Sequence, residues 1–154
     1  MTLRLSLRAA RALMLTAQGL DHRPKKAATK ESVLETIRRM GALQIDTIHV
    51  VARSPYLVLW SRLGHYDTRW LEELLSDRAV FEYWSHEACF LPIEDYPLYL
   101  HQMRDPSSLG WKYPREWAEA HQAEIARVLA SIREHGPLRS ADFTNNEKRK
   151  NGWW

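Results

Sequence analysis

The Gln44-Ile45-Asp46 triplet combines residue types that could hydrolyse a glycosidic bond. In an extended segment, residues two apart project to one face, so Gln44 and Asp46 would share a face while Ile45 points into the core. Breaking an N-glycosidic bond passes through an oxocarbenium-like state, which a fixed carboxylate can stabilise while it orients or deprotonates the attacking water. The glutamine amide can hold the water or the sugar. A solvated pair at a strand edge has the same spacing, so the triplet alone leaves both interpretations open.

Three further residues are candidate DNA contacts. Arg53 could reach a phosphate, or it could be an ordinary surface arginine. Trp84 could stack on an unpaired base, or it could fill the core. His86 could contact a phosphate or shuttle a proton, or it could belong to a turn packed on the core.

The remaining reactive and aromatic side chains are interpreted structurally. Cys89 lies among apolar residues, which predicts a buried and inert thiol. No Cys/His cluster has zinc-site spacing, so we expect no structural metal. Four tryptophans at helical or linker positions are expected in the core: Trp60, Trp70, Trp111 and Trp117.

Caps and hydrophobic periods predict the elements that position these residues. The predicted helices are 7–18, capped by Ser6 and with Leu7, Ala10, Met14 and Ala17 as its apolar stripe; 30–40, capped by Thr29; 56–63, after Ser54-Pro55; and 68–76, capped by Asp67. A short strand is predicted to begin at Leu43, and a hairpin pairs 79–84 with 87–91 around Ser85-His86. This order predicts a mainly α fold with small β wings (α+β), a winged helix-turn-helix preceded by one extra helix.

The second part of the chain is predicted to begin another winged-helix unit. We expect a helix over about 94–103, a first domain at 1–104, a linker at 105–113 and a second, incomplete domain at 114–154. One long helix is predicted from Pro114 to about His135. Terminal tryptophans usually need a partner surface, so we expect that sequence is missing after Trp154.

Composition predicts a cytoplasmic protein, and its charge is compatible with binding to nucleic acid. The 154 residues carry a formal net charge of +3, and the first thirty contain seven Arg or Lys against one acid, Asp21. Such a segment attracts phosphate-rich partners, although a solvated basic face has the same composition. No apolar run reaches the roughly 20 residues that span a bilayer, and no signal-peptide pattern is present, so we expect no membrane partner.

Several long motifs resemble one family. The stretches LQIDTIHVVARSPYLVLWSRLGHYDTRWLEELL, EYWSHEACFLP, GWKYPREW, GPLRSADF and the final GWW resemble the bacterial winged-helix DNA glycosylases of the AlkZ/YcaQ group, from about Leu5 to Trp154. The Gln-x-Asp form is typical of the YcaQ-like branch. The resemblance implies that Gln44 and Asp46 are catalytic. It also implies tandem winged helices followed by a β-barrel, around a basic DNA channel.

The resemblance also implies what the protein acts on. The expected partner is double-stranded DNA with alkylated or crosslinked bases, bound by a monomer without metal or cofactor. The expected reaction is hydrolysis of alkylated purines from DNA and unhooking of interstrand crosslinks. Because the chain would stop inside the second winged-helix unit, half of the channel would be absent and the chain alone is expected to be inactive or nearly so.

Two other functions fit parts of the sequence. A non-enzymatic winged-helix regulator would place the 68–76 helix in the major groove. That helix offers only Arg69 against Glu72 and Glu73, which is poor for holding phosphate or reading bases. A protein-interaction fragment would depend on the terminal tryptophans alone.

Overall fold

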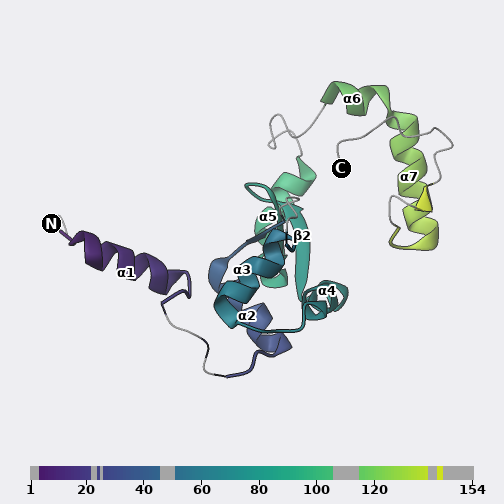
Figure 1. Cartoon of the computed structure of the whole chain (residues 1–154). Helices are drawn as coiled ribbons and strands as arrows, with labels where there is room; N and C mark the ends of the chain where they lie inside the picture. The colour runs from purple at the N-terminus through teal and green to yellow at the C-terminus, as the bar shows by residue number, and fades with distance from the viewer. Residues whose placement is uncertain are drawn as a thin grey trace. The chain divides into compact units, whose positions relative to one another are not determined.

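A computed structural model describes residues 4–21, 24, 26–45, 51–105, 115–138 and 142–143. The chain forms two compact units, Met1–His101 and Gln102–Trp154. The described elements of the first unit are α1 (Leu7–Ala17), α2 (Lys30–Met40), β1 (Leu43–Gln44), α3 (Ser54–Leu63), α4 (Arg69–Ser76), β2 (Val80–Trp84), β3 (Ala88–Pro92), a 3-10 turn η1 (Ile93–Asp95) and most of α5 (Tyr96–Arg104) (Figure 1). The second unit contains α6 (Arg115–Ala120) and α7 (Gln122–His135).

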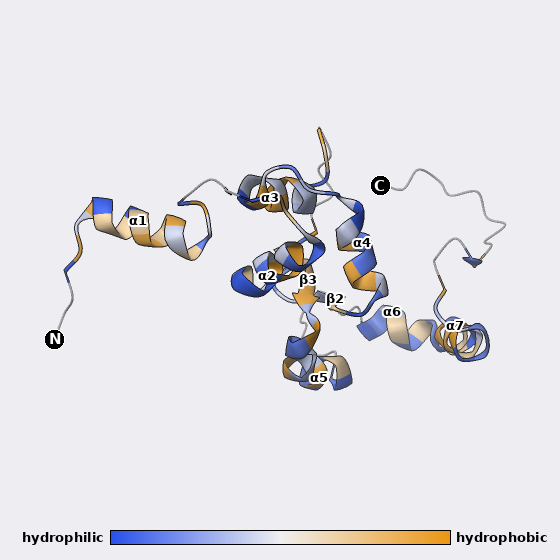
Figure 2. Cartoon of the chain, turned by 90° about the horizontal axis from the view of Figure 1, so that it is seen from below, coloured by the Kyte–Doolittle hydropathy of each residue, from blue (hydrophilic) through white to orange (hydrophobic). Residues whose placement is uncertain are grey.

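The first unit has the winged-helix order, as predicted. The three strands form an antiparallel sheet in the order β1-β3-β2. The register pairs Leu43 with Phe90 across β1 and β3, and Tyr83 with Cys89 across the hairpin. Figure 2 shows α2, α3 and α4 on one side of the strands and α5 on the other. The predicted α+β fold is therefore confirmed.

The core lies between the three helices and one face of the sheet. Its buried residues come from every element of the winged helix and from the α3–α4 connection: Val33, Ile37, Leu43, Leu59, Tyr66, Leu71, Leu74, Val80 and Phe90. Burying such aliphatic and aromatic side chains contributes about 1.5–3 kcal/mol each relative to exposure, so this cluster holds β1 against the helices.

Helix α2 begins and ends where the sequence predicts. Thr29 Oγ1 accepts from the amide of Ser32 at 3.2 Å, and Ser32 Oγ accepts from the amide of Thr29 at 2.8 Å, which together form a capping box. Gly41 ends the helix with φ of 78°, a left-handed conformation that glycine adopts without a steric cost. The start of α4 differs slightly: Thr68 precedes the helix, while the carboxylate of Asp67 accepts from the amide of Arg69 at 3.0 Å.

The prediction of one long helix to His135 is wrong, because the structure breaks it at His121. This residue leaves the helical region with φ of −117° and ψ of 30°. Its Nδ1 lies 2.7 Å from the carbonyl oxygen of Trp117, and its ring stacks on that indole with centroids 4.3 Å apart. The backbone amide of His121 still donates to that carbonyl at 3.1 Å, but the side-chain amide of Gln122 donates to the carbonyl of Ala118 at 2.7 Å, the acceptor that the backbone amide of Gln122 would use in a continuous helix.

Other expectations have mixed outcomes. Trp60 and Trp117 were expected in the core, but they are 60% and 54% exposed, so that prediction is wrong. Trp70 is partly buried against the core cluster. The residues of the predicted linker after Asp105, together with Pro114, Trp111 and the terminal tryptophans, lie outside the described residues, and the second winged-helix domain stays a prediction. None of the described helices is both long and apolar enough to cross a bilayer.

Candidate functional site

Strand β1 turns Gln44 away from the core. Leu43 is 1% exposed and belongs to the core cluster, and Ile45 packs against that same cluster. The amide of Ile45 donates to the carbonyl of Ala88 at 2.7 Å, which continues the pairing one residue beyond the strand. Gln44 lies between these two residues and is exposed, so alternation places its side chain on the opposite face of the sheet. Asp46 lies outside the described residues.

The face that carries Gln44 is partly covered by α5. Across the sheet, Gln44 pairs with Cys89 and Cys89 pairs with Tyr83, so the three residues form one row. Tyr99 of α5 packs edge-on against Tyr83, with ring centroids 5.5 Å apart, and against Phe81 at 6.0 Å. This aromatic packing buries the β2 side of the row, while Gln44 stays exposed on β1 at the edge of the sheet.

His86 reaches the same row from the tip of the hairpin. The turn is closed by the amide of Ser85, which donates to the carbonyl of Glu87 at 3.0 Å. His86 is exposed, and its Nδ1 lies 3.9 Å from Sγ of Cys89. Cys89 is fully buried, as predicted. Two candidate site residues, Gln44 and His86, are therefore both neighbours of Cys89.

The register separates Trp84 from this group. Trp84 pairs with Ala88, and the alternation along β3 puts this pair on the face of Phe90 rather than that of Cys89. The indole is 45% exposed near the end of the wing, so it does not fill the core. Trp84 is thus half-exposed, on the other face of the sheet from Gln44.

Arg53 is exposed at the start of α3. Its backbone is extended, and its carbonyl accepts from the amide of Tyr56 at 3.1 Å. Helix α3 packs against β1, so Arg53 stands at one end of an element that supports the strand. Within the described residues, its guanidinium makes no hydrogen bond with Gln44.

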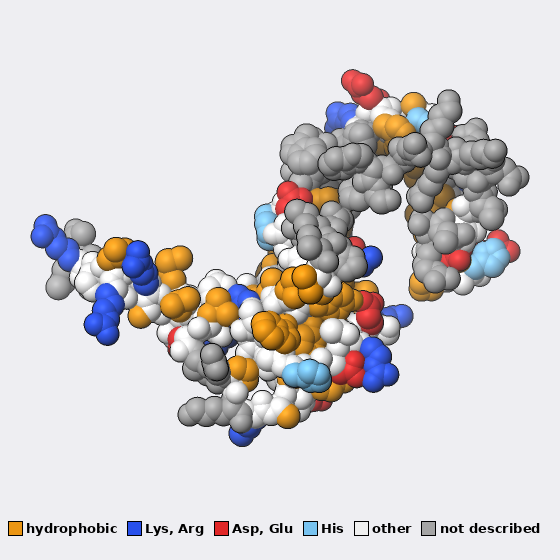
Figure 3. All heavy atoms as spheres, in the orientation of Figure 1, with side chains coloured by type: hydrophobic (Ala, Val, Ile, Leu, Met, Phe, Trp, Pro, Cys, Tyr) orange, Lys and Arg blue, Asp and Glu red, His pale blue; other side chains and the backbone are white. Residues whose placement is uncertain are grey.

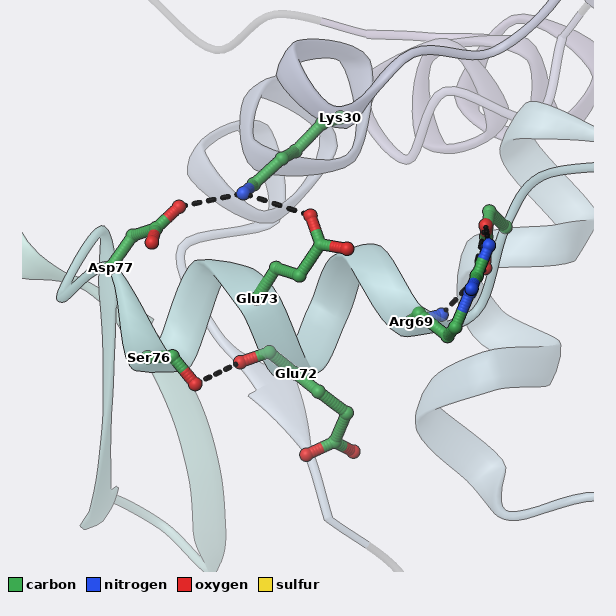
Figure 4. A network of polar contacts seen from close by, with 7 residues as sticks. Lys30, Arg69, Glu72, Glu73, Ser76 and Asp77 are labelled. Atoms are coloured by element: carbon green, nitrogen blue, oxygen red, sulfur yellow. Dashed lines mark hydrogen bonds and ion pairs between the residues drawn. The ribbon is translucent and has the colours of Figure 1, made fainter.

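The outer side of α4 is acidic, and a lysine from α2 is held there. Nζ of Lys30 lies 2.6 Å from Asp77 and 3.0 Å from Glu73, and these bonds raise the pKa of Lys30 (Figure 4). Sequence analysis missed this pairing, because Lys30 and Asp77 are 47 residues apart. Lys30 is therefore held in ion pairs with these carboxylates and does not offer its charge to a phosphate.

The one arginine of α4, Arg69, is also held in an ion pair. Arg69 donates to both carboxylate oxygens of Asp67, with the shortest contact at 2.6 Å, and these hydrogen bonds lower the pKa of Asp67 to about 2. Glu72 accepts from the hydroxyl of Tyr56 at 2.7 Å. In a winged helix the second helix of the motif is the one that enters the major groove. Here that helix presents carboxylates, which phosphate repels.

The comparison with known families identifies the class of protein. A profile of the family DNA glycosylase AlkZ-like matches residues 37–154. The chain therefore belongs to the AlkZ-like DNA glycosylase family, which confirms the resemblance found in the sequence. No solved structure matches the chain.

Family membership gives the general role. The matched residues include β1, the hairpin and the Gln44-Ile45-Asp46 triplet. The protein is a DNA glycosylase by family, with DNA as the substrate and repair as the role.

The contact between Cys89 and His86 was missed by sequence analysis, although the spacing of a histidine and a cysteine around a tight turn was visible in SHEAC.

Proposed function

We propose that the protein hydrolyses the N-glycosidic bond of alkylated purines, including crosslinked ones, with Asp46 and Gln44 as its catalytic residues. One observation carries this proposal: Gln44 is exposed between two residues that pack into the core, inside the segment that matches the glycosylase family. If the alternation of β1 continues by one residue, Asp46 joins Gln44 on the same face.

The chemistry follows from these two side chains. Alkylation of a purine ring nitrogen places positive charge on the base and makes it a better leaving group. The C1′–N bond breaks, its electron pair leaves with the base, and a water oxygen bonds to C1′. Asp46 stabilises the sugar cation and takes the proton of the water, and the Gln44 amide holds that water in place. No lysine is needed as a nucleophile, so the product is an intact abasic site.

The other candidate residues are proposed to hold the DNA. The exposed Trp84 offers an aromatic surface to an unpaired base. His86, whose Nδ1 lies near Cys89, the strand partner of Gln44, would contact a phosphate near the scissile sugar. Arg53 would contact a phosphate from the start of α3. The acidic side of α4 counts against the alternative of a non-enzymatic regulator that reads the major groove.

The test is release of base by the complete gene product under single-turnover conditions. One duplex carries N7-methylguanine and another carries a nitrogen-mustard crosslink. The Asp46→Asn variant is expected to lose at least 100-fold in the rate of release from both. Asp95→Asn, at a carboxylate of η1, is the matched control and is expected to keep the rate. Undiminished release by Asp46→Asn would refute the assignment of Asp46, and an untouched crosslink would exclude crosslinked purines.

A further inference from the structure

Helix α1 is attached to the winged helix by its end. It has no buried residue, and Leu7, Met14 and Ala17 of the predicted apolar stripe are exposed, with Met14 at 70%. At its C-terminus, Arg39 of α2 donates to the carbonyl of Thr16. Arg62 of α3 donates to the carbonyl of Gln18 at 2.9 Å. These two cations meet carbonyls at the C-terminal end of the helix, where the helix dipole is negative. The interactions fix the end of α1 on the body of the unit.

One side of α1 is lined by arginines. Arg8 and Arg11 lie on α1 at a spacing of three, which places residues on a common side of a helix, and Arg4 lies in the non-helical segment before the N-cap Ser6. We call these three residues the arginine face. All three are exposed, and none has a hydrogen bond or ion pair with any residue in the described part of the chain. Figure 3 shows Lys and Arg side chains spaced along this helix.

No carboxylate in the described part of the chain forms an ion pair with the arginine face. Asp21, the one acid among the first thirty residues, lies beyond the far end of α1, where it accepts from the hydroxyl of Thr16 at 3.0 Å. The outer side of α4, where a winged helix usually meets DNA, carries carboxylates that hold its neighbouring cations. Attraction to DNA must therefore come from another part of the unit.

We propose that the arginine face of α1 binds the phosphate backbone of the DNA substrate. Arg8 and Arg11 are separated along the helix by a rise of about 4.5 Å, and the long side chains of the three arginines can adjust to neighbouring phosphates of one strand. The anchoring of α1 by Arg39 and Arg62 keeps this face at a fixed place on the winged helix. The proposal rests on the role of the family, because DNA is taken as the partner.

The size of the effect follows from counterion release. Each neutralised phosphate adds about 0.9 to the slope of log K against log salt, or about eightfold in affinity between 1 M and 0.1 M salt. Three contacts would contribute about 2.7 to the slope. An amphipathic basic helix can also bind an anionic membrane surface, and the experiment distinguishes the two partners.

The experiment measures binding of the complete gene product to an unmodified 20-base-pair duplex by fluorescence anisotropy, over a range of salt concentrations. The triple variant R4Q/R8Q/R11Q is expected to lower the slope by about 2 to 3. The variant R4K/R8K/R11K keeps the charge and should keep most of the slope. Leu13→Gln, at an exposed position on the opposite side of the same helix from Arg8 and Arg11, should leave it unchanged. Circular dichroism checks that α1 still forms in each variant.

A salt slope for R4Q/R8Q/R11Q equal to that of the wild type would overturn the proposal. If this variant also loses binding to phosphatidylglycerol vesicles, the arginine face binds a membrane surface instead. Base release at saturating DNA separates this proposal from the catalytic one. R4Q/R8Q/R11Q should keep the single-turnover rate, whereas Asp46→Asn should lose the rate and keep the affinity.

Discussion

Replacing Leu43 by alanine should weaken both the fold and the strand that presents Gln44. Leu43 is 1% exposed and packs in the core cluster. The change removes three carbon atoms, which costs about 2.4 kcal/mol in transfer free energy, and a cavity adds to this loss. The expected decrease in the free energy of unfolding is about 2–4 kcal/mol. The matched control is Leu57→Ala on α3, where the side chain is 44% exposed and the expected loss is below about 1 kcal/mol.

Two assays measure this prediction. Urea unfolding followed by circular dichroism gives the free energy of unfolding of each variant. Hydrogen exchange at the amide of Ile45, which donates to Ala88, reports how firmly β1 is paired. Leu43→Ala should accelerate that exchange more than Leu57→Ala does. Equal losses of stability in the two variants, or unchanged exchange at Ile45, would show that burial of Leu43 does not hold the strand.

Two further predictions concern side chains near the site and near α4. The hydroxyl of Tyr83 is buried and has no hydrogen-bond partner within the described residues, so Tyr83→Phe should leave the free energy of unfolding unchanged or raise it by up to about 1 kcal/mol. Tyr56→Phe, which loses the bond to Glu72, should lower it by about 1 kcal/mol; a larger loss for Tyr83→Phe would contradict this reasoning. Hydrogen bonds from Arg69 lower the pKa of Asp67 from 3.8 to about 2 in the folded state. The ionised carboxylate therefore stabilises the fold at pH values above 3.8, and this stabilisation is lost as the pH falls toward 2. Asp67→Asn should therefore flatten the pH dependence of the urea midpoint in that acidic range. An unaltered pH profile would show that the Asp67 carboxylate does not cause this pH dependence.

Local signals in the sequence predicted most of the first unit. The caps at Thr29 and Gly41 bound α2 because each satisfies backbone groups that the helix leaves unpaired. The alternation of Leu43, Gln44 and Ile45 follows from the two-residue period of a strand, so the exposure of Gln44 was predictable. The orientation of Trp60 was not, because a helical position alone does not say which side of the helix meets the core.

Contacts between distant residues could not be predicted. The pairing of Lys30 with Asp77 depends on how α2 and α4 pack, and nothing in either segment specifies it. The break at His121 goes with a side-chain hydrogen bond from Gln122 to the carbonyl of Ala118, which the residue types alone do not specify. The approach of His86 to Cys89 depends on the path of the turn.

The most direct test of the account is a double-mutant cycle on Gln44 and Asp46, with the single-turnover rate of base release from an N7-methylguanine duplex as the measured quantity. If both side chains act on one water, Gln44→Ala and Asp46→Asn should each slow release by about 10² to 10³. The double variant should then be about as slow as the slower single variant. A wild-type rate for Asp46→Asn, or losses that multiply in the double variant, would contradict the claim that the two residues form one catalytic unit.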